Sequence, residues 1–340
     1  QRPEMMNLPA CYRFFCVLLL VGQGSLSAQS LQPFTATQKH MGTDVIIRVW
    51  APNREVAEQG FQAAYARVKA LEKVMSDYDA ESEISRLVRQ APMERPVPIS
   101  ADLWQVLQRS EKISVASNGA FDVSIGALSR LWRRARRQKQ LPSTERLQQD
   151  IRSVGYQAVV LGQDTATIQL KRAGVRLDLG GIGKGFAADA ALTELRRLGL
   201  RVALVDAGGD LAIGARPPGK PGWRIGVAPL QAEGAPSRYL HLSECGIATS
   251  GDAWQFVEIG GRRYSHILDP RTGLGLSTRS SVTVIAADAT AADGLASAVS
   301  VLGPQKGLAL IEKFQHASAL VVQSHGQGVQ TWKSCRFPHK

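Results

Sequence analysis

The sequence contains few of the residues that build metal clusters or disulfide frameworks. Only four of its 340 residues are cysteine, and Cys11 and Cys16 both fall in an N-terminal apolar run. The other two, Cys245 and Cys335, are too few for a disulfide scaffold, and no CxxC metal-binding pair occurs. Solenoid repeats and low-complexity tracts are also absent. These absences exclude small disulfide-rich scaffolds, zinc ribbons and repeat proteins, whereas an apolar fraction of 44% is enough for a buried core.

Long hydrophobic runs are lacking as well, apart from CYRFFCVLLLVG at 11–22. This run is shorter than the roughly 20 apolar residues that span a bilayer. Its basic residue, Arg13, and its exit into small polar residues are typical of a secretory signal peptide. We therefore expect residues 1–28 to be a signal peptide cut near Ala28, and 29–340 to form one exported, periplasmic domain. Leu26 is a poor residue at position −3 of that cut, so an uncleaved N-terminal anchor is the alternative.

Acidic residues are outnumbered, with 29 against 41 basic ones and a net charge of +12. Part of the excess lies in SRLWRRARRQKQ at 129–140, which has six bases and no acid. Nucleic-acid binding is one interpretation of such a run. The other is a solvated helix end or loop, which can face an anionic membrane surface. Because Trp132 is the only aromatic residue among these bases, we favour the second interpretation and expect no nucleic acid as a partner.

Hydrophobic periodicity predicts helices at 54–75, 103–116, 290–302 and 305–314, and one that follows the glycines after Asp178 and ends at Gly199. β-Branched segments predict strands at 44–50 and 280–288, two strands within 157–170, one leading into a glycine turn within 201–215, and a hairpin that turns at Gly260 and Gly261. Hairpins and irregular alternation favour an α+β fold with mixed or antiparallel sheets and packed helices over a doubly wound parallel sheet. The segment 217–222, PPGKPG, is predicted to be a surface loop.

The segment DLGGIGKG at 178–185 is the best candidate for a phosphate site. Glycines before a helix expose backbone N–H groups to an anion, and Lys184 adds positive charge. It is neither a Walker A loop, because Gly185 follows the lysine, nor a GxGxxG fingerprint, because Phe186 replaces the third glycine. A purely structural turn is an equal alternative. DAGGDLAIG at 206–214 supplies a second glycine turn, for which a tight hairpin is the simpler interpretation.

Two further segments carry groups suited to phosphate chemistry. In AADGLASAV, Asp293 and Ser297 are four residues apart on one helical face, where their oxygens can hold a hard cation such as Mg²⁺. An ordinary helix-capping acid is the alternative there. In YSHILDPRTG, His266 can move a proton near neutral pH and Arg271 can face a phosphate. The alternative for this segment is a plain turn after a strand.

Eight motifs in order resemble one family, the ApbE family of FAD:protein FMN transferases, from His40 to about Val322. They are MGT, MSDYDAESEISRL, NGAFDVSIGAL, DLGGIGKGFAAD, VDAGGDLAIG, ATSGD, YSHILDPRTG and SVTVIAADATAADGLASAV. Such enzymes transfer FMN from FAD to a threonine or serine hydroxyl of an acceptor protein, with Mg²⁺ on the pyrophosphate and AMP as the leaving group. The resemblance therefore implies an ApbE-like fold, Mg²⁺ as cofactor and FAD as substrate.

The resemblance also assigns roles to residues of this sequence. The metal ligands would be the carbonyl of Gly181 and the side chains of Asp293 and Ser297, a position where the family usually has threonine. His266 and Lys184 would be catalytic. FAD would be held by Met41, Tyr78, Ala120, Phe121, Asp122, Asp178, Lys184 and Ile267. For Tyr78, a position in the protein core is the alternative to a ring stacked on FAD.

Two other functions fit the same motifs. A Mg²⁺-dependent FAD pyrophosphatase would use water in place of the acceptor hydroxyl, and a non-catalytic carrier would only bind FAD. The pairing of Asp293 and Ser297 together with His266 argues against a carrier, because storage needs neither. The implied acceptors are exported or membrane redox proteins, such as subunits of Na⁺-translocating NADH:quinone reductase, Rnf complexes or NosR-like proteins, and the basic run allows association with the inner-membrane surface.

Overall fold

An eight-stranded antiparallel sheet forms the centre of the unit Leu31–Lys340. The computed structural model describes residues 30–228, 230, 235–236, 238–251, 255–326 and 328–338. The predicted signal peptide and its cut near Ala28 lie outside these residues. The strands follow the order β1-β2-β6-β7-β10-β13-β14-β15. Their bounds are β1 Gln32–His40, β2 Thr43–Ala51, β6 Ala203–Ala207, β7 Asp210–Ile213, β10 Cys245–Gly251, β13 Ser280–Ala286, β14 Ser318–His325 and β15 Gly328–Lys333.

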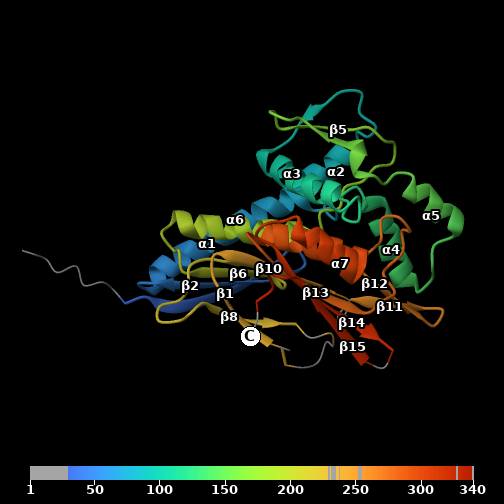
Figure 1. The fold of residues 1–340 in the computed structure, drawn as a ribbon. Helices are drawn as coiled ribbons and strands as arrows, with labels where there is room; N and C mark the ends of the chain where they lie inside the picture. The colour runs from blue at the N-terminus through green and yellow to red at the C-terminus, as the bar shows by residue number, and fades with distance from the viewer. Residues whose placement is uncertain are drawn as a thin grey trace, which may run out of the picture. The chain divides into compact units, whose positions relative to one another are not determined.

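The central strands of this sheet are covered on both faces. Helices α1 (Arg54–Met75), α6 (Gly183–Arg197) and α7 (Ala289–Glu312) lie along one face (Figure 1). A hairpin of β8 (Trp223–Val227) and β9 (Arg238–Leu242) packs with the other face in a second apolar cluster. Every residue of β13 is buried as a result, which is why this strand is an almost unbroken apolar run in the sequence.

Helix α7 is a core helix, although its length and apolarity alone would let it cross a membrane. More than half of its most apolar window is buried within the protein, against α6 and the sheet. Gly303 interrupts it with a φ of 75° and a ψ of 179°, and Pro304 follows. The prediction of two consecutive helices at 290–302 and 305–314 is therefore confirmed.

The remaining elements pack beside the main sheet. Near one end of α1 are α2 (Glu83–Val88), α3 (Ala101–Ala116), the short helix η1 (Tyr156–Ala158) and a small sheet of β3 (Val97–Pro98), β5 (Thr167–Leu170) and β4 (Val159–Leu161). Helices α4 (Gly126–Gln138) and α5 (Thr144–Ile151) lie near the hairpin of β11 (Phe256–Ile259) and β12 (Arg262–Ser265) (Figure 1). A separate apolar cluster joins α4 to this hairpin through Leu128, Trp132, Val257 and Tyr264.

The structure confirms the predicted α+β class and most of the predicted elements. Helix α1 has the predicted bounds, and the β11–β12 hairpin turns at Gly260 and Gly261. The segment 217–222 is the predicted loop between β7 and β8. The elements additional to those predicted above are strands β1, β3, β8, β9, β10, β14 and β15, helices α2, α4 and α5, and the short helix η1. Cys245 and Cys335 are both free thiols.

Candidate functional site

The glycine-rich turn before α6 is shaped by its first residue. The Asp178 carboxylate accepts a 2.8 Å hydrogen bond from the Gly180 N–H, which closes an Asx turn. A Cβ at Gly181 would lie 3.0 Å from the Ser297 hydroxyl oxygen and 3.3 Å from the Phe121 ring. A larger residue would therefore push these neighbours away. Three predicted site residues, Gly181, Phe121 and Ser297, thus meet at this turn.

Helices α6 and α7 cross so closely that Gly185 has no space for a side chain. A Cβ at this position would lie 2.3 Å from the carbonyl oxygen of Ala289. One turn further along α6, Asp189 accepts hydrogen bonds of 3.0 and 2.8 Å from the first two N–H groups of α7. This cap and the close crossing hold Asp293 and Ser297 opposite the glycine turn.

Three oxygen donors at this crossing form a set that fits a hard divalent cation. The Ser297 hydroxyl lies 3.3 Å from the Gly181 carbonyl oxygen, and Asp293 accepts a 3.0 Å hydrogen bond from the Gly185 N–H. Neighbouring ligands of octahedral Mg²⁺ are about 2.9 Å apart, close to the first separation. Burial raises the pKa of Asp293 more than Lys184 lowers it, so a nearby cation would stabilise the carboxylate. Within the described ranges no three His, Cys, Asp or Glu side chains cluster, so this mixed donor set is the candidate.

Lys184 lies in the first turn of α6 and forms an ion pair with Asp210. A tight turn between β6 and β7 brings Asp210 there, and it requires a φ of 66° at Gly208 and 98° at Gly209. The second glycine motif is therefore a hairpin, as expected. Burial lowers the pKa of Lys184. The carboxylates of Asp210, Asp293 and Asp206 together raise this pKa by more than burial lowers it, so the net shift is upward. A protonated Lys184 at the start of α6 favours a bound anion.

Arg133, on α4, links two motifs of the predicted site. Its guanidinium forms ion pairs with Asp77 and, at 3.7 Å, with Asp178. Its Cζ lies 4.4 Å from the centre of the Tyr78 ring, which is 80% exposed. The core position considered for Tyr78 is therefore wrong. The solvated position predicted for the basic run is also wrong for the Arg133 side chain, which is only 21% exposed. Nothing in the local sequence singles out Arg133 among the bases of this run.

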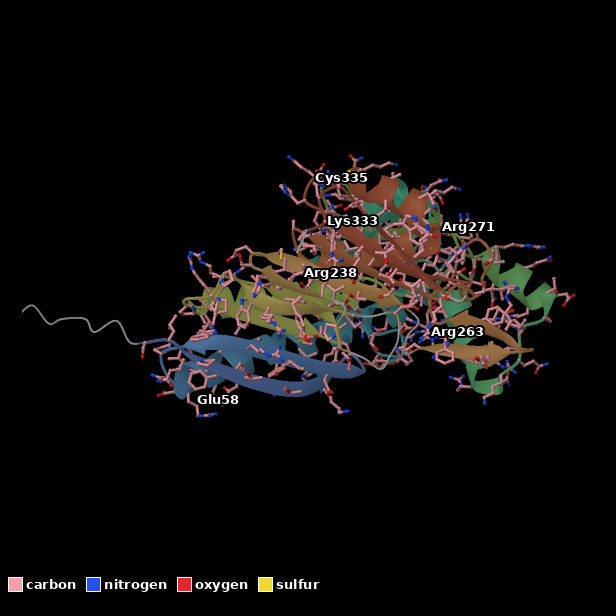
Figure 2. The ribbon with its side chains drawn as sticks, turned by 60° about the horizontal axis from the view of Figure 1, so that its bottom comes forward. Glu58, Arg238, Arg263, Arg271, Lys333 and Cys335 are labelled. Atoms are coloured by element: carbon pink, nitrogen blue, oxygen red, sulfur yellow. The ribbon has the colours of Figure 1, made fainter. Side chains whose placement is uncertain are left out.

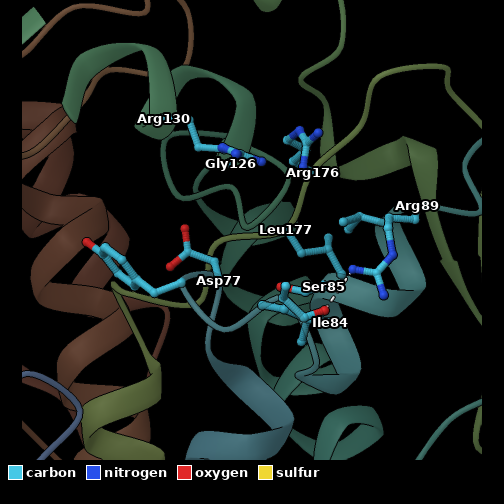
Figure 3. A pocket seen from close by; sticks show the side chains of 11 residues that line it. Asp77, Ile84, Ser85, Arg89, Gly126, Arg130, Arg176 and Leu177 are labelled. Carbon is cyan, nitrogen blue, oxygen red and sulfur yellow. Dashed lines mark hydrogen bonds between the residues drawn. The ribbon is translucent and has the colours of Figure 1, made fainter. Parts of the chain in front are cut away.

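A cavity of about 250 Å³ opens beside Tyr78. In Figure 3, Arg130 and Arg176 border one side of it, and Ile84 and Ser85 border the opposite side. The cavity thus combines an aromatic ring, apolar walls and guanidinium groups. Such a lining suits a planar heterocycle joined to phosphate.

The predicted cofactor residues Ala120, Phe121 and Asp122 form a buried turn. The Asp122 carboxylate accepts hydrogen bonds from the Ser124 N–H (2.8 Å), the Ser124 hydroxyl (2.6 Å) and the Tyr156 N–H (2.8 Å). Asp122 therefore braces this turn from within the protein, and the Phe121 ring is the part that reaches the glycine turn.

Met41 approaches the glycine turn from the main sheet. Its backbone is left-handed, with a φ of 52°, and its N–H donates to the Glu72 carboxylate. A Cβ at Gly183 would lie 3.6 Å from the Met41 methyl group, so this side chain lies against the start of α6. Met41 therefore lies next to Gly183, the residue before Lys184.

His266 follows β12 in a turn that is anchored to α4. The Trp132 indole N–H donates a 3.1 Å hydrogen bond to the Ser265 carbonyl, and the Ile267 N–H donates to the Ser265 hydroxyl at 3.0 Å. The His266 Nδ1 lies 3.2 Å from the Gln255 carbonyl oxygen. A carbonyl oxygen only accepts, so Nδ1 is the donor in this contact.

Arg271 does not present a free guanidinium to this site. It forms two hydrogen bonds of 2.8 Å with the Asp269 carboxylate, within the same turn. Asp269 also accepts hydrogen bonds from the backbone of Arg271 and, through its own carbonyl, from Gly273. The expectation that Arg271 faces a phosphate is therefore corrected, because its charge stabilises the turn that carries His266.

Comparisons with known proteins agree on one family. A family model described as the ApbE family matches residues 41–321. An FAD:protein FMN transferase of Haemophilus influenzae is 31% identical over 289 residues, covering 83% of this chain and 83% of its own length. Another, from Treponema pallidum, is 32% identical over 324 residues, covering 90% and 89%.

Solved structures give the same result. The flavin transferase ApbE from Vibrio cholerae matches with a TM-score of 0.80 at 25% identity, covering 90% of this chain and 98% of that chain. The apo form of the flavinyl transferase ApbE from Pseudomonas stutzeri matches with a TM-score of 0.79 at 29% identity, covering 90% and 96%.

Replacing Arg133 with glutamine tests its electrostatic role. Arg133→Gln leaves Asp77 and Asp178 without their counterion, so we expect the free energy of unfolding to fall by about 1–3 kcal/mol. Burial raises the pKa of Asp178, whereas Arg133 lowers it. Without Arg133, the ionised Asp178 carboxylate is less stable in the folded protein, and this cost grows as the pH rises and the carboxyl group loses its proton. The loss should therefore be larger at pH 8 than at pH 5 in urea unfolding.

Arg134→Gln is the matched control for this experiment, because the exposed Arg134 side chain is hydrogen-bonded to Gln138, at 3.3 Å, and is remote from both acids. Equal losses in the two variants, or a loss that does not change with pH, would contradict the proposed role of Arg133.

Proposed function

Because its ApbE match covers 281 residues and relatives above 30% identity span most of it, this chain belongs to the ApbE family, and we propose that it transfers FMN from FAD to a serine or threonine hydroxyl of acceptor proteins. One observation carries this proposal. The crossing of α6 and α7 joins the oxygens of Gly181, Asp293 and Ser297 to Lys184 at a helix N-terminus, where a pyrophosphate is best neutralised.

The cation for this reaction would be Mg²⁺, held by the Gly181 carbonyl and the side chains of Asp293 and Ser297. When bound, it would neutralise charge on the pyrophosphate oxygens and so assist departure of AMP. Ser297 supplies a hydroxyl oxygen where the family usually has threonine. Lys184 adds a fixed positive charge beside the same phosphates, while Asp210 keeps its ammonium in place.

His266 is the proton-transfer residue in this proposal. Its Nε2 would take the proton of the acceptor hydroxyl as the hydroxyl oxygen attacks the phosphorus of the FMN half of FAD. A phosphoester bond then forms between FMN and the acceptor, the phosphoanhydride bond breaks, and AMP leaves. The hydrogen bond from Nδ1 to Gln255 keeps the imidazole in the tautomer that this step needs.

The remaining site residues would hold FAD. The exposed ring of Tyr78, backed by Arg133, offers an aromatic face to a heterocycle. Met41 and Phe121 supply apolar contacts on either side of the glycine turn, and Asp178 and the backbone around Ile267 complete the predicted set.

We further propose that the enzyme works in the periplasm, on exported or membrane redox proteins. The support is the N-terminal run at 11–22 and the family's usual acceptors, namely subunits of Na⁺-translocating NADH:quinone reductase, Rnf complexes and NosR-like proteins. Association with the inner-membrane surface is part of this proposal and rests on the net charge of +12.

The export proposal predicts a mature protein that begins near residue 29. N-terminal sequencing of the periplasmic protein should identify this start, because signal peptidase cuts after small residues such as Ala28. A variant with Leu18→Arg and Leu19→Arg interrupts the apolar run and should stay uncut in the cytoplasm. Recovery of the unaltered protein with its apolar run still attached would contradict cleavage.

The metal assignment predicts that Asp293→Asn abolishes dependence on Mg²⁺ together with most activity. Asparagine keeps the size of the side chain but removes its negative charge, so we expect transfer to fall by a factor on the order of 10²–10³. Mass spectrometry of an acceptor incubated with FAD, Mg²⁺ and enzyme measures this as a gain of one FMN. Asp164→Asn, on an exposed turn, is the matched control. Full transfer by Asp293→Asn in the presence of a chelator would sink the assignment.

The proton-transfer assignment predicts that His266→Ala binds FAD normally but reacts slowly. Loss of a general base should reduce the rate of transfer by a factor on the order of 10²–10⁴. Single-turnover assays with FAD and acceptor measure this rate, and FAD fluorescence measures binding. His241→Ala, on the exposed side of β9, should leave both unchanged. AMP release without labelling of the acceptor by the unaltered enzyme would favour an FAD pyrophosphatase instead.

A further inference from the structure

A second, larger cavity of about 690 Å³ lies between α4 and α5, next to the cavity beside Tyr78. Its walls carry five arginines and one acid among the residues that the structure describes. They are Arg130, Arg134, Arg137, Arg146, Arg176 and Asp150. We refer to this cavity as the arginine groove.

The positive charge of the arginine groove is left largely uncompensated by the protein. Its one acid, Asp150, is paired with Arg146 at 3.2 Å. In the described part of the chain, no carboxylate forms an ion pair with Arg130, Arg137 or Arg176. Burial lowers the pKa of Arg176, repulsion by the neighbouring guanidinium of Arg130 lowers it further, and Asp150 opposes both effects. An external anion would relieve this repulsion.

The arginine groove is joined to the candidate active site by the helix that forms its wall. Arg130 and Arg176 line both the groove and the smaller cavity beside Tyr78 (Figure 3). On other faces of α4, Arg133 pairs with Asp178, and Trp132 donates to the carbonyl of the residue before His266. A ligand in the groove would thus lie one helix away from the reacting groups.

Further basic side chains continue this surface toward the His266 turn. Arg263 on β12 and Arg271 in the following turn lie at the end of the molecule that also carries α4 and α5 (Figures 1 and 2). A partner that reaches from the arginine groove to His266 would therefore meet Arg263 and the ion pair of Arg271 with Asp269.

The chemistry of the groove favours one class of ligand. Guanidinium groups bind carboxylates in a bidentate fork, and several side by side match a segment with several acidic residues. No aromatic side chain lines the groove, so it lacks the stacking platform that single-stranded nucleic acids use. It is also a concave channel between two helices, which suits a peptide chain better than a flat membrane surface.

We propose that the arginine groove binds an acidic segment of the acceptor protein and so delivers the acceptor hydroxyl to the neighbouring site. This inference rests on the proposed transferase function, because only a protein substrate has to be guided to His266. Electrostatic complementarity of this kind mainly raises the rate of productive encounter and selects the partner.

The test reverses two groove charges that contact neither Asp178 nor the cavity beside Tyr78. In the double variant with Arg134→Glu and Arg137→Glu, we expect the KM for a purified acceptor to rise about 10- to 100-fold. The kcat and the Kd for FAD should be unchanged, because the reacting groups are intact. The rise should shrink at high salt, where exposed charges are screened.

The matched control carries the same change in net charge at a distance from the groove. Arg95→Glu with Lys306→Glu places two reversals on exposed positions before β3 and on α7. This control should keep the KM of the unaltered enzyme. A KM that rises equally in both double variants would show a general charge effect and would overturn the proposal, as would an unchanged KM in the groove variant.

Competition experiments identify the ligand of the groove. An octaglutamate peptide should inhibit acceptor labelling by the unaltered enzyme and lose this effect in the groove variant. Equal inhibition by inorganic phosphate at matched charge, or tighter binding to phosphatidylglycerol vesicles than to the peptide, would overturn the acidic-segment proposal. If the unaltered enzyme labels no acceptor at all, the proposed function fails, and peptide binding by the groove, measured by calorimetry, still tests the groove separately.

Discussion

The close crossing of α6 and α7 is the constraint on which the candidate site depends. At Gly185 the two backbones approach within a distance that leaves no space for a Cβ, and Asp189 fixes the start of α7 from the side of α6. A longer approach distance would separate the Gly181 carbonyl from the Ser297 hydroxyl. It would also move Asp293 away from the N–H of Gly185. The geometry of the oxygen donors is thus a consequence of helix packing, which α1 and the main sheet support from one side.

Buried charge is the second organising feature of the site. Charged side chains are expensive to remove from water unless they are paired, and Lys184 and Arg133 each have a carboxylate partner. Lys184 pairs with Asp210, and Arg133 pairs with Asp77 and Asp178. These pairs hold their charges in fixed positions before a substrate arrives. A site of this kind stabilises developing charge without having to reorganise during the reaction.

Helix α4 gives the basic run three different roles on three faces. Trp132 and Leu128 pack against the β11–β12 hairpin, Arg133 turns toward Asp178, and Arg134 and Arg137 face the arginine groove. A helix of this length presents each face to a different neighbour because its side chains project at about 100° intervals. One segment can therefore position the His266 turn, brace Tyr78 and offer an exposed basic surface.

The local sequence determined the helices and the hairpin that have a clear apolar spacing or turn pattern. Helix α1 and the pair of helices that forms α7 follow from apolar spacing and from Gly303 and Pro304. The β11–β12 hairpin follows from Gly260 and Gly261. Resemblance over eight ordered motifs identified the family and the main site residues. Single strands such as β1 and β15 gave little signal, because an exposed or edge strand does not need a strong apolar pattern.

Tertiary structure alone decided which charges meet. Nothing local distinguishes Arg133 from Arg134, yet the phase of α4 and the position of Asp178 bury one and expose the other. Arg271 is an exception, because its partner Asp269 is only two residues away and the pair forms within one turn. Asp210 reaches Lys184 only because β6, β7 and α6 pack together. Ion pairs depend on distances of a few ångströms between segments far apart in the chain, and such distances are set by packing.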